Sequence, residues 1–416
     1  MPKIRIEGQR KLSGTINISG AKNSAVALIP ASILCDEEVT IANVPNISDI
    51  DSLEEILLSL NAKIDRDNDT VKIDSSSVCN SFIREELSKK LRASYYFMGA
   101  LLGRFKKVDM YFPGGCSIGE RPINLHLKGF EELGANVTIK DNRFIIEADE
   151  LVGSKIYLDI PSVGATINIM LAAVKAKGKT YIKNAAKEPE IVNVATLLNN
   201  MGAKIKGAGT NVIVIEGVKY LHSCFHEVIP DRIEAGTYLI MGALLGDNLK
   251  INNIIPTHLE ALTSKLKEAG VNLVINDDNI VVSSSDKLNA VDVETLVYPG
   301  FPTDLQQPFV PFLTQCEGIS RLKETIYENR FQNIPDTVRM GADISVRDNE
   351  VAIIKGKTDL CGCDVVATDL RGGASMLICG LIASGVTTVD NIGHILRGYD
   401  NIVFKLKSVG AKIELI

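Results

Sequence analysis

A short phrase recurs six times along this chain, and no other feature limits its fold as much. An apolar residue is followed by Gly-Ala, or a close variant, and then by a further residue and a second apolar one. The second residue of the phrase falls at positions 61, 134, 202, 270, 341 and 410, so copies lie about 70 residues apart. A fixed period of this length is typical of folds assembled from repeated supersecondary units. We therefore expect six units.

The residues around this phrase predict the content of each unit. Before its first copy, positions 53, 56, 57 and 60 are apolar and positions 51, 54 and 55 are acidic, which is the spacing of an amphipathic helix. Gly or Asn directly after such a helix is the usual left-handed residue that ends it. Short alternating strands are expected next, and a second phrase with the same period ends in Asn43, Asn184, Asn253 and Asn391.

Each unit also contains a stretch that is apolar on nearly every helical face. These stretches cover residues 24–35, 93–102, 165–176, 235–245, 305–316 and 374–383. A helix without a polar face must be buried on all sides. Because 416 residues exceed what one core organises, we predict an α/β fold of two domains with three units each. Buried helices form the centre of each domain and sheets its outside, with a crossing at Ile229–Ile233.

The composition argues against several classes of protein. The net charge of −6 is unfavourable for a general nucleic-acid surface. No apolar run reaches the length of a membrane helix and the N-terminus is not signal-like, so we expect a cytoplasmic protein with no membrane contact and eight reduced cysteines. The chain lacks a dinucleotide-type Gly-x-Gly-x-x-Gly turn, a Walker lysine motif and paired zinc-ligand spacing, so we expect no metal and no cofactor.

Polar residues stand where the apolar helices begin. A helix N-terminus already carries partial positive charge, so a cation there opposes the local field and indicates an external anion. Four of the six helices begin with such a cation: Lys22, Arg92, Arg232 and Arg371. Two more arginines, Arg330 and Arg397, lie in loop-like sequence and are suited to carboxylates or phosphates. We expect the helix starts to face a shared cleft that binds an anionic substrate.

Other residues at these helix starts are expected to act as caps. Asp231, Ser162 and Thr368 have side chains that commonly accept hydrogen bonds from the first backbone N–H groups of a helix. His126 is the one histidine close in sequence to the cysteine segment described next. We expect it to position other groups by hydrogen bonding rather than to act as a general base.

The segment Pro113–Arg121 places a thiol, Cys116, between glycines and five residues before a guanidinium. Glycine permits backbone angles that side chains forbid, so the segment can form a tight loop. A glycine-rich loop with a thiol and a cation suits a lid over an anionic substrate. A surface turn with a spectator cysteine is the alternative on this stretch alone.

Taken together, these motifs resemble one known family. They are Ser19-Gly-Ala-Lys-Asn23, Leu91-Arg-Ala-Ser94, Pro113-Gly-Gly-Cys-Ser-Ile-Gly119, Arg121-Pro, Phe301-Pro-Thr-Asp304, Glu328-Asn-Arg-Phe331, Thr368-Asp-Leu-Arg371 and Arg397-Gly-Tyr399. The chain resembles the enolpyruvyl transferases, and among them the branch that acts on UDP-N-acetylglucosamine, from its first strand to its last. The resemblance implies two inside-out α/β domains, with residues 1–20 as the first strand of the C-terminal half, 21–229 as the cysteine-loop domain and 230–416 as the remainder.

The resemblance also implies an activity. The enolpyruvyl group of phosphoenolpyruvate is transferred to the 3′-hydroxyl of UDP-N-acetylglucosamine by addition and elimination, with release of phosphate, as the first committed step of peptidoglycan synthesis. Such an enzyme serves cell-wall formation, and with it cell shape and division. Its expected partners are these two small molecules; an oligomeric state is not predicted.

Specific residues receive roles by the same resemblance. Cys116, Asp304, Lys22 and Arg397 are the implied catalytic residues, with Cys116 as proton donor to the methylene carbon and Asp304 as base for the sugar hydroxyl. The implied phosphoenolpyruvate contacts are Lys22, Asn23, Arg121, Arg330, Arg371 and Arg397. The implied contacts of the nucleotide sugar are Arg92, Arg121, Pro122, Ile123, Asn124, Leu125, Pro161, Ser162, Val163, Gly164, Asp304 and Ile326. His126, Asp231 and Asp369 are implied supporting residues.

Two alternatives remain open from the sequence. The shikimate-pathway enolpyruvyl transferase shares the fold and the phosphoenolpyruvate chemistry, but lacks this cysteine loop. A ring or clamp built from repeats is the non-enzymatic alternative, and it would need a basic inner surface that a net charge of −6 does not favour.

Overall fold

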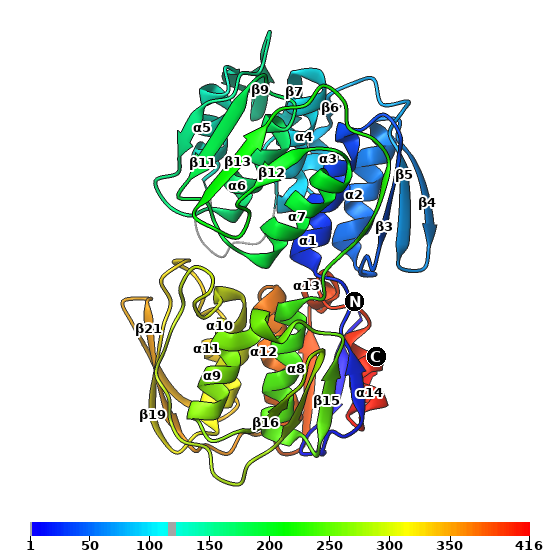
Figure 1. Cartoon of the computed structure of the whole chain (residues 1–416). Helices are drawn as coiled ribbons and strands as arrows, with labels where there is room; N and C mark the ends of the chain where they lie inside the picture. Colours follow the sequence, from blue (N-terminus) through cyan, green and yellow to red (C-terminus); the bar gives the residue numbers. More distant parts are fainter. Residues whose placement is uncertain (1, 115–121) are drawn as a thin grey trace. The chain divides into compact units, whose positions relative to one another are not determined.

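The computed structural model describes residues 2–114 and 122–416, which divide into two compact units (Figure 1). We name residues 20–114 with 122–229 the N-terminal unit, and residues 2–19 with 230–416 the C-terminal unit. Each unit has its own hydrophobic core. The predicted site residues Cys116 and Arg121 lie outside the described residues.

All the sheets of the described residues have four strands and one common pattern. A parallel pair forms one side, and two antiparallel strands complete the sheet. In the N-terminal unit the sheets are β14 (Cys224–Glu227), β3 (Glu38–Ala42), β5 (Thr70–Asp74) and β4 (Lys63–Asp67); β6 (Phe82–Ile83), β7 (Lys107–Tyr111), β9 (Arg143–Glu147) and β8 (Asn136–Lys140); and β10 (Lys155–Tyr157), β11 (Lys179–Lys183), β13 (Val212–Glu216) and β12 (Lys204–Lys206).

The C-terminal unit repeats this pattern in three more sheets of its described residues. They are β2 (Thr15–Asn17), β15 (Leu249–Asn252), β17 (Asn279–Ser283) and β16 (Asn272–Ile275); β18 (Val293–Glu294), β19 (Gly318–Lys323), β21 (Val351–Gly356) and β20 (Asp343–Arg347); and β22 (Asp364–Val366), β23 (Val386–Asp390), β1 (Ile4–Glu7) and β24 (Lys412–Leu415). The first two strands of the chain therefore complete sheets of the C-terminal unit. In the C-terminal unit, β2 pairs in parallel with β15. The corresponding position in the N-terminal unit, beside β3, is occupied by β14 from the end of that unit.

The apolar stretches form buried helices, as predicted. They are α1 (Lys22–Ala31), α4 (Tyr96–Phe105), α6 (Val163–Ala173), α8 (Arg232–Leu245), α10 (Thr303–Thr314) and α12 (Leu370–Ile382), with short 3₁₀ turns η1 (Ser32–Leu34), η2 (Arg92–Tyr95) and η3 (Pro256–Leu259) nearby. Every residue of α8 from Ile233 to Ala243 is buried. Figure 1 shows α8, α10 and α12 enclosed by the sheets of their unit. No helix of the described residues is long and apolar enough to cross a membrane.

The remaining helices lie at the outside. They are α2 (Ser48–Ser59), α3 (Glu85–Ser88), α5 (Asn124–Glu132), α7 (Pro189–Asn200), α9 (Glu260–Glu268), α11 (Ile334–Arg339), α13 (Gly393–Leu396) and α14 (Ile402–Ser408). The six predicted stop residues, Asn61 and the five glycines of the recurring phrase, have φ between 73° and 116°. This left-handed conformation ends a helix and is accessible to glycine and asparagine at little cost.

The second recurring phrase has a structural role of its own. Its four asparagines each follow the second strand of a parallel pair and have φ between 55° and 59°. The side-chain amide of each donates a hydrogen bond to the carbonyl of the residue that follows the first strand. The pairs are Asn43 with Val228, Asn184 with Leu158, Asn253 with Ile18 and Asn391 with Ala367, at 2.8, 2.9, 2.8 and 3.2 Å. We call these residues the strand-end asparagines.

Candidate active site

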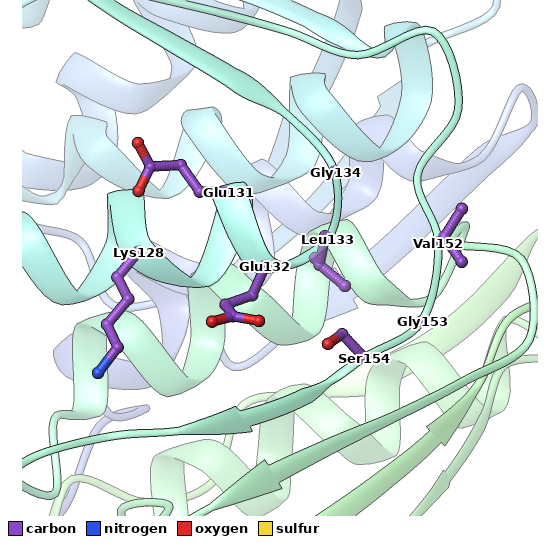
Figure 2. A pocket seen from close by; sticks show the side chains of 8 residues that line it. All are labelled: Lys128, Glu131, Glu132, Leu133, Gly134, Val152, Gly153 and Ser154. Carbon is purple, nitrogen blue, oxygen red and sulfur yellow. The ribbon is translucent and has the colours of Figure 1, made fainter.

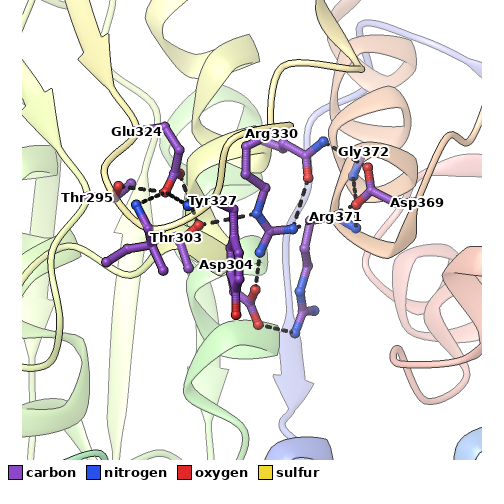
Figure 3. A network of polar contacts seen from close by, with 11 residues as sticks. Thr295, Thr303, Asp304, Glu324, Tyr327, Arg330, Asp369, Arg371 and Gly372 are labelled. Carbon is purple, nitrogen blue, oxygen red and sulfur yellow. Dashed lines mark hydrogen bonds and ion pairs between the residues drawn. The ribbon is translucent and has the colours of Figure 1, made fainter. Parts of the chain in front are cut away.

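One carboxylate of the C-terminal unit is shared by two buried guanidinium groups (Figure 3). Asp304 lies in the first turn of α10. Arg371, from the first turn of α12, places Nη2 3.1 Å from Asp304 Oδ2, and Arg330 donates through Nη2 to the other oxygen, Oδ1. The arginine side chains are 3% and 2% exposed, and that of Asp304 is 26% exposed. The fold thus joins three of the predicted site residues directly.

The network continues to Asp369, which caps α12. One of its carboxylate oxygens accepts hydrogen bonds from the backbone N–H groups of Arg371 and Gly372, at 3.0 and 3.2 Å. Gln307 donates to the other oxygen at 2.9 Å. The prediction of Thr368 as the cap was wrong, because α12 begins at Leu370 and the N-cap position therefore belongs to Asp369. The Thr368 hydroxyl instead donates to Asp369 at 3.2 Å.

The charges around Asp304 fix its ionisation. Burial acts to raise its pKa, but the guanidinium groups of Arg371 and Arg330 outweigh that effect and hold the pKa well below its ordinary value. Nη1 of Arg371 is buried and has no hydrogen-bond acceptor among the described residues. A buried donor without an acceptor costs free energy, and an anionic ligand oxygen would relieve this cost. The arrangement therefore suits an anion beside Asp304.

The other predicted residues of this unit lie around the network. Tyr399, two residues after Arg397, has its ring 5.3 Å from the guanidinium carbon of Arg371. Asp231 caps α8, as predicted, and accepts from the N–H groups of Ile233 and Glu234 at 2.8 and 2.9 Å. The N–H of Ile326 donates to Glu324 at 2.8 Å.

In the N-terminal unit, Lys22 and Asn23 open α1. Nζ of Lys22 lies 2.8 Å from Oδ2 of Asp49, in the first turn of α2. Both side chains are largely buried, at 14% and 7% exposed. An internal carboxylate thus meets the cation that the sequence pattern assigned to an external anion. The acidic first turn of α2 was the available signal for Asp49, but nothing in the pattern joined it to Lys22.

Three helix starts of the N-terminal unit meet around His126. Its ring lies 4.9 Å from that of Tyr95 in η2, and a Cβ added at Gly164 in α6 would lie 2.9 Å from the His126 ring. Burial first, and then the Arg92 guanidinium, lower the pKa of His126 to about 3. His126 is therefore neutral near pH 7 and is unsuited to proton transfer there.

The hydrogen bonds of His126 also fix its tautomer. The amide oxygen of Asn168 accepts from the N–H of Gly99 at 2.8 Å, so its nitrogen must be the group 2.9 Å from His126 Nδ1. Nδ1 accepts this hydrogen bond, and the proton lies on Nε2. These contacts hold the His126 ring in one orientation.

The predicted nucleotide-sugar residues of this unit lie at the same helix starts. Asn124 and Leu125 open α5, directly after Pro122 and Ile123. Ser162 caps α6 and accepts from the N–H of Ala165 at 3.3 Å, as predicted. Pro161 precedes this cap, and Val163 and Gly164 follow it in the first turn.

A surface hollow of the N-terminal unit lies elsewhere (Figure 2). It has a volume of about 500 Å³ and is bounded by the end of α5, from Lys128 to Gly134, and by Val152–Ser154. Figure 2 shows Glu131 and Glu132 directed to different sides of α5. None of the predicted site residues lines this hollow. Size alone does not mark the candidate site.

Comparison with known proteins identifies the family. Residues 6–406 match the family model described as EPSP synthase (3-phosphoshikimate 1-carboxyvinyltransferase). The chain belongs to the enolpyruvyl transferase family. Among curated members, it is 56% identical to UDP-N-acetylglucosamine 1-carboxyvinyltransferase 2 of Bacillus cereus. The alignment of 414 residues covers 99% of this chain and 96% of that protein. The enzymes of the same name from Bacillus subtilis and Listeria innocua are 54% and 52% identical, each over 99% of the chain and over 96% and 97% of their own lengths.

Solved structures of the family confirm the predicted fold. The enolpyruvyl transferase NikO of Streptomyces tendae superposes with a TM-score of 0.90 at 26% identity, over 100% of this chain and 98% of its own. EPSP synthase of Acinetobacter baumannii gives a TM-score of 0.76 at 17% identity over the whole of both chains, a likeness of fold alone. The prediction that this family member is an enzyme is confirmed, because its curated relatives are named as transferases.

Proposed function

We propose that this enzyme transfers the enolpyruvyl group of phosphoenolpyruvate to the 3′-hydroxyl of UDP-N-acetylglucosamine and releases phosphate. The product would commit the sugar to peptidoglycan synthesis in the cytoplasm. The observation that carries the proposal is the convergence of Arg330 and Arg371 on Asp304, in a chain 56% identical to an enzyme with that name.

Phosphoenolpyruvate carries a carboxylate and a phosphate, and the proposal gives each its own cations. Arg330, Arg371 and Arg397 bind the carboxylate; the unpaired Nη1 of Arg371 supports this assignment. Lys22, Asn23 and Arg121 bind the phosphate. Guanidinium groups bind planar carboxylates through two parallel hydrogen bonds, so they orient the substrate as well as attract it.

The same assignment explains how Asp304 becomes a base. With Arg330 and Arg371 bound to it, the carboxylate has a lowered pKa and accepts protons poorly. When the substrate carboxylate takes over these two guanidinium groups, Asp304 loses their stabilisation and its pKa rises. It can then draw the proton from the sugar 3′-hydroxyl. Substrate binding thus prepares the base.

The chemistry proceeds in two steps. In the addition, the sugar oxygen forms a bond to C-2 of phosphoenolpyruvate, while C-3 receives a proton from Cys116 and becomes a methyl group. In the elimination, the Cys116 thiolate takes a proton back from the methyl group and the bond from C-2 to the phosphate oxygen breaks, which restores the vinyl group. The proton that Asp304 took from the sugar hydroxyl leaves with the phosphate. Asp304 and Asp369 favour the positive charge that develops at C-2. None of these steps requires a metal or an organic cofactor.

The nucleotide sugar is assigned to the helix starts around His126 and to Ile326. Arg92, Pro122–Leu125 and Pro161–Gly164 supply a cation, apolar surface and helix N-termini, a combination suited to a uridine diphosphate. His126 holds these starts in register. Asp231 keeps α8 capped. Burial acts to lower the pKa of Arg371, but Tyr399, Asp304 and Asp231 together raise it.

One observation favours a second candidate. The matching family model is described by the shikimate-pathway activity, 3-phosphoshikimate 1-carboxyvinyltransferase. The experiment that separates the two is phosphate release from phosphoenolpyruvate with UDP-N-acetylglucosamine or shikimate 3-phosphate as acceptor. We expect turnover with the nucleotide sugar only. Turnover restricted to shikimate 3-phosphate would overturn the proposal.

A further inference from the structure

Glu324 stands where other units carry a strand-end asparagine. Like those asparagines, it directly follows the second strand of a parallel pair, here β18 with β19. The N–H of Thr295 donates to the Lys323 carbonyl at 2.9 Å, as Val228 N–H donates to Ala42 in the first unit at 3.0 Å. The backbone register is thus the same, while the side chain at this position is an acid.

The carboxylate of Glu324 ties together three segments (Figure 3). Oε1 accepts from the Thr295 hydroxyl at 2.9 Å and from the N–H groups of Ile326 and Tyr327 at 2.8 and 3.2 Å. Oε2 accepts from the hydroxyl of Thr303 at 3.0 Å. Glu324 is 3% exposed. Among the described residues, backbone N–H groups and threonine hydroxyl groups supply its hydrogen bonds.

Two of these segments carry the proposed site. Thr303 is the first residue of α10 and the neighbour of Asp304. The Thr303 hydroxyl oxygen also accepts from Nε of Arg330 at 3.2 Å. On the other side, the ring of Tyr327 lies 5.3 Å from the Arg330 guanidinium carbon. Glu324 thus supports Arg330 through two routes, the Thr303 hydroxyl and the backbone of the turn at Tyr327.

We propose that Glu324 is a positioning residue that fixes Asp304 and Arg330 through the Thr303 hydroxyl and the Ile326–Tyr327 backbone. This inference rests on the proposed function, in which Arg330 binds the substrate carboxylate and Asp304 is the base. A strand-end asparagine performs the structural task of this position in four other units. The acid adds an acceptor that reaches α10 and orients the Thr303 hydroxyl, so its lone pair faces Arg330.

The test uses two variants of the relay and one matched control. T303V removes the relay hydroxyl but keeps the shape of the side chain, and T303S keeps the hydroxyl. T314V removes a buried hydroxyl from the opposite end of α10, where it bonds to the Pro311 carbonyl at 2.7 Å. Steady-state phosphate release gives kcat and KM, and thermal unfolding gives stability. We expect kcat/KM for phosphoenolpyruvate to fall about 10- to 100-fold in T303V. T303S and T314V should remain within about threefold of the wild type.

E324Q tests the acid itself. Its amide nitrogen would face the Thr303 hydroxyl as a donor and reverse that hydrogen bond, so we expect a loss in kcat/KM similar to that of T303V. Adding T303V to E324Q should then cost little more, because both changes break the same chain of contacts. Wild-type turnover in T303V, or losses in all variants that simply follow their unfolded fractions, would overturn the positioning role.

A readout without turnover separates this inference from the proposed function. In E324Q a neutral amide oxygen replaces the carboxylate oxygen that accepts from the N–H groups of Ile326 and Tyr327, and it is the weaker acceptor. We therefore expect these N–H groups to exchange with deuterium faster in E324Q than in the wild type, and at an unchanged rate in T314V. If the wild type is inactive with UDP-N-acetylglucosamine, the proposed function fails, whatever the exchange shows. Unchanged exchange in E324Q would overturn the role of Glu324 even in an active enzyme.

Discussion

The single negative charge of Asp304 faces two guanidinium groups, and it cannot neutralise both alone. Arg330 and Arg371 both donate to it, and Asp369 supplies a second negative charge 3.8 Å from Arg330. Burying two guanidinium groups is costly unless each finds a counter-charge. In the proposed function, the same two guanidinium groups that bind the substrate carboxylate therefore hold Asp304 in a weakly basic state until the substrate arrives.

Replacing Asp304 tests this balance. Asp304→Ala should bind the nucleotide sugar, but turnover should fall about 100- to 10,000-fold, because the sugar hydroxyl loses its proton acceptor. Calorimetry gives the binding, and phosphate release gives the turnover. Near-normal turnover in this variant would remove Asp304 as the base.

The same variant gives a separate result on the arginines. Without Asp304, Arg330 and Arg371 lack their shared counter-charge, so added phosphate should raise the melting temperature of Asp304→Ala more than that of the wild type. Equal shifts in both proteins would contradict the role of Asp304 as the counter-charge that an added anion must displace.

Cys116 lies outside the described residues, and its role remains a prediction from the family resemblance. Cys116→Asp should retain part of the turnover, since a carboxylic acid can also deliver a proton. It should lose inactivation by fosfomycin, the epoxide that the family's cysteine captures. Time courses of phosphate release with and without fosfomycin measure both. Continued inactivation of the variant would place the reactive thiol elsewhere.

At the residue scale, the sequence predicted the members of the network better than their partners. Arg371 and Arg330 were identified by charge and context, and the structure joins them to Asp304. The pairing of Lys22 with Asp49 and the role of Glu324 were missed. These contacts join residues from different elements, and a pattern along one segment contains no information on them. One signal was available for Glu324: it occupies the position that a strand-end asparagine occupies in four other units.

At the scale of elements, glycine lets two buried helices of the N-terminal unit touch closely. A Cβ added at Gly99 in α4 would lie 2.3 Å from the Asn168 carbonyl oxygen of α6. Asn168 also donates to His126, so this helix contact supports the helix starts assigned to the nucleotide sugar. Close packing of this kind tolerates no added atom without movement of the backbone.

Gly99→Ala should therefore destabilise the protein by about 1–3 kcal/mol or more. Its KM for the nucleotide sugar should rise, because His126 shifts with Asn168. Gly393→Ala is the control, since a Cβ there would meet nothing within 4 Å. Thermal unfolding and initial rates give both quantities. Equal melting temperatures for the two variants would contradict the close contact.

The recurring phrases predicted the elements well because each phrase has a local physical cause. The six stop residues are left-handed, and the apolar stretches are buried helices. The repeat did not predict that β2 pairs with β15 of the C-terminal unit while β14 pairs with β3 of the N-terminal unit. Each strand fits the same position in either unit, so local pattern does not distinguish the two pairings.

At the scale of the whole molecule, the two units should respond to pH in opposite ways. Burial lowers the pKa of His126 to about 3 and that of His226 to about 4, and both belong to the N-terminal unit. The unfolded chain binds these protons at about pH 6.5, so stability present above that pH is lost as pH falls. Burial raises the pKa of Glu234, in the C-terminal unit, to about 7, although Lys405 lies 2.7 Å away. That contribution is present below about pH 4.5 and is lost as pH rises through 7.

Lowering the pH from 7.5 to 5 should thus destabilise the N-terminal unit, by about 2 kcal/mol for each histidine. The C-terminal unit should gain from Glu234 over the same change. Hydrogen exchange of peptides from each unit, corrected for intrinsic rates, measures both. His126→Gln should reduce the acid effect, and His222→Gln, at an exposed position, should not. Equal responses of both units would contradict these assignments.

The most direct test of the proposed reaction is turnover in D₂O, followed by mass spectrometry of the nucleotide-sugar product. Addition places a solvent deuteron on C-3, and elimination then removes one of the three hydrogens of that methyl group. We predict a product that has gained an enolpyruvyl group and carries deuterium on C-3, the terminal carbon of its vinyl group. An enolpyruvyl product without deuterium would contradict addition and elimination, and phosphate release without any gain in product mass would contradict the transfer itself.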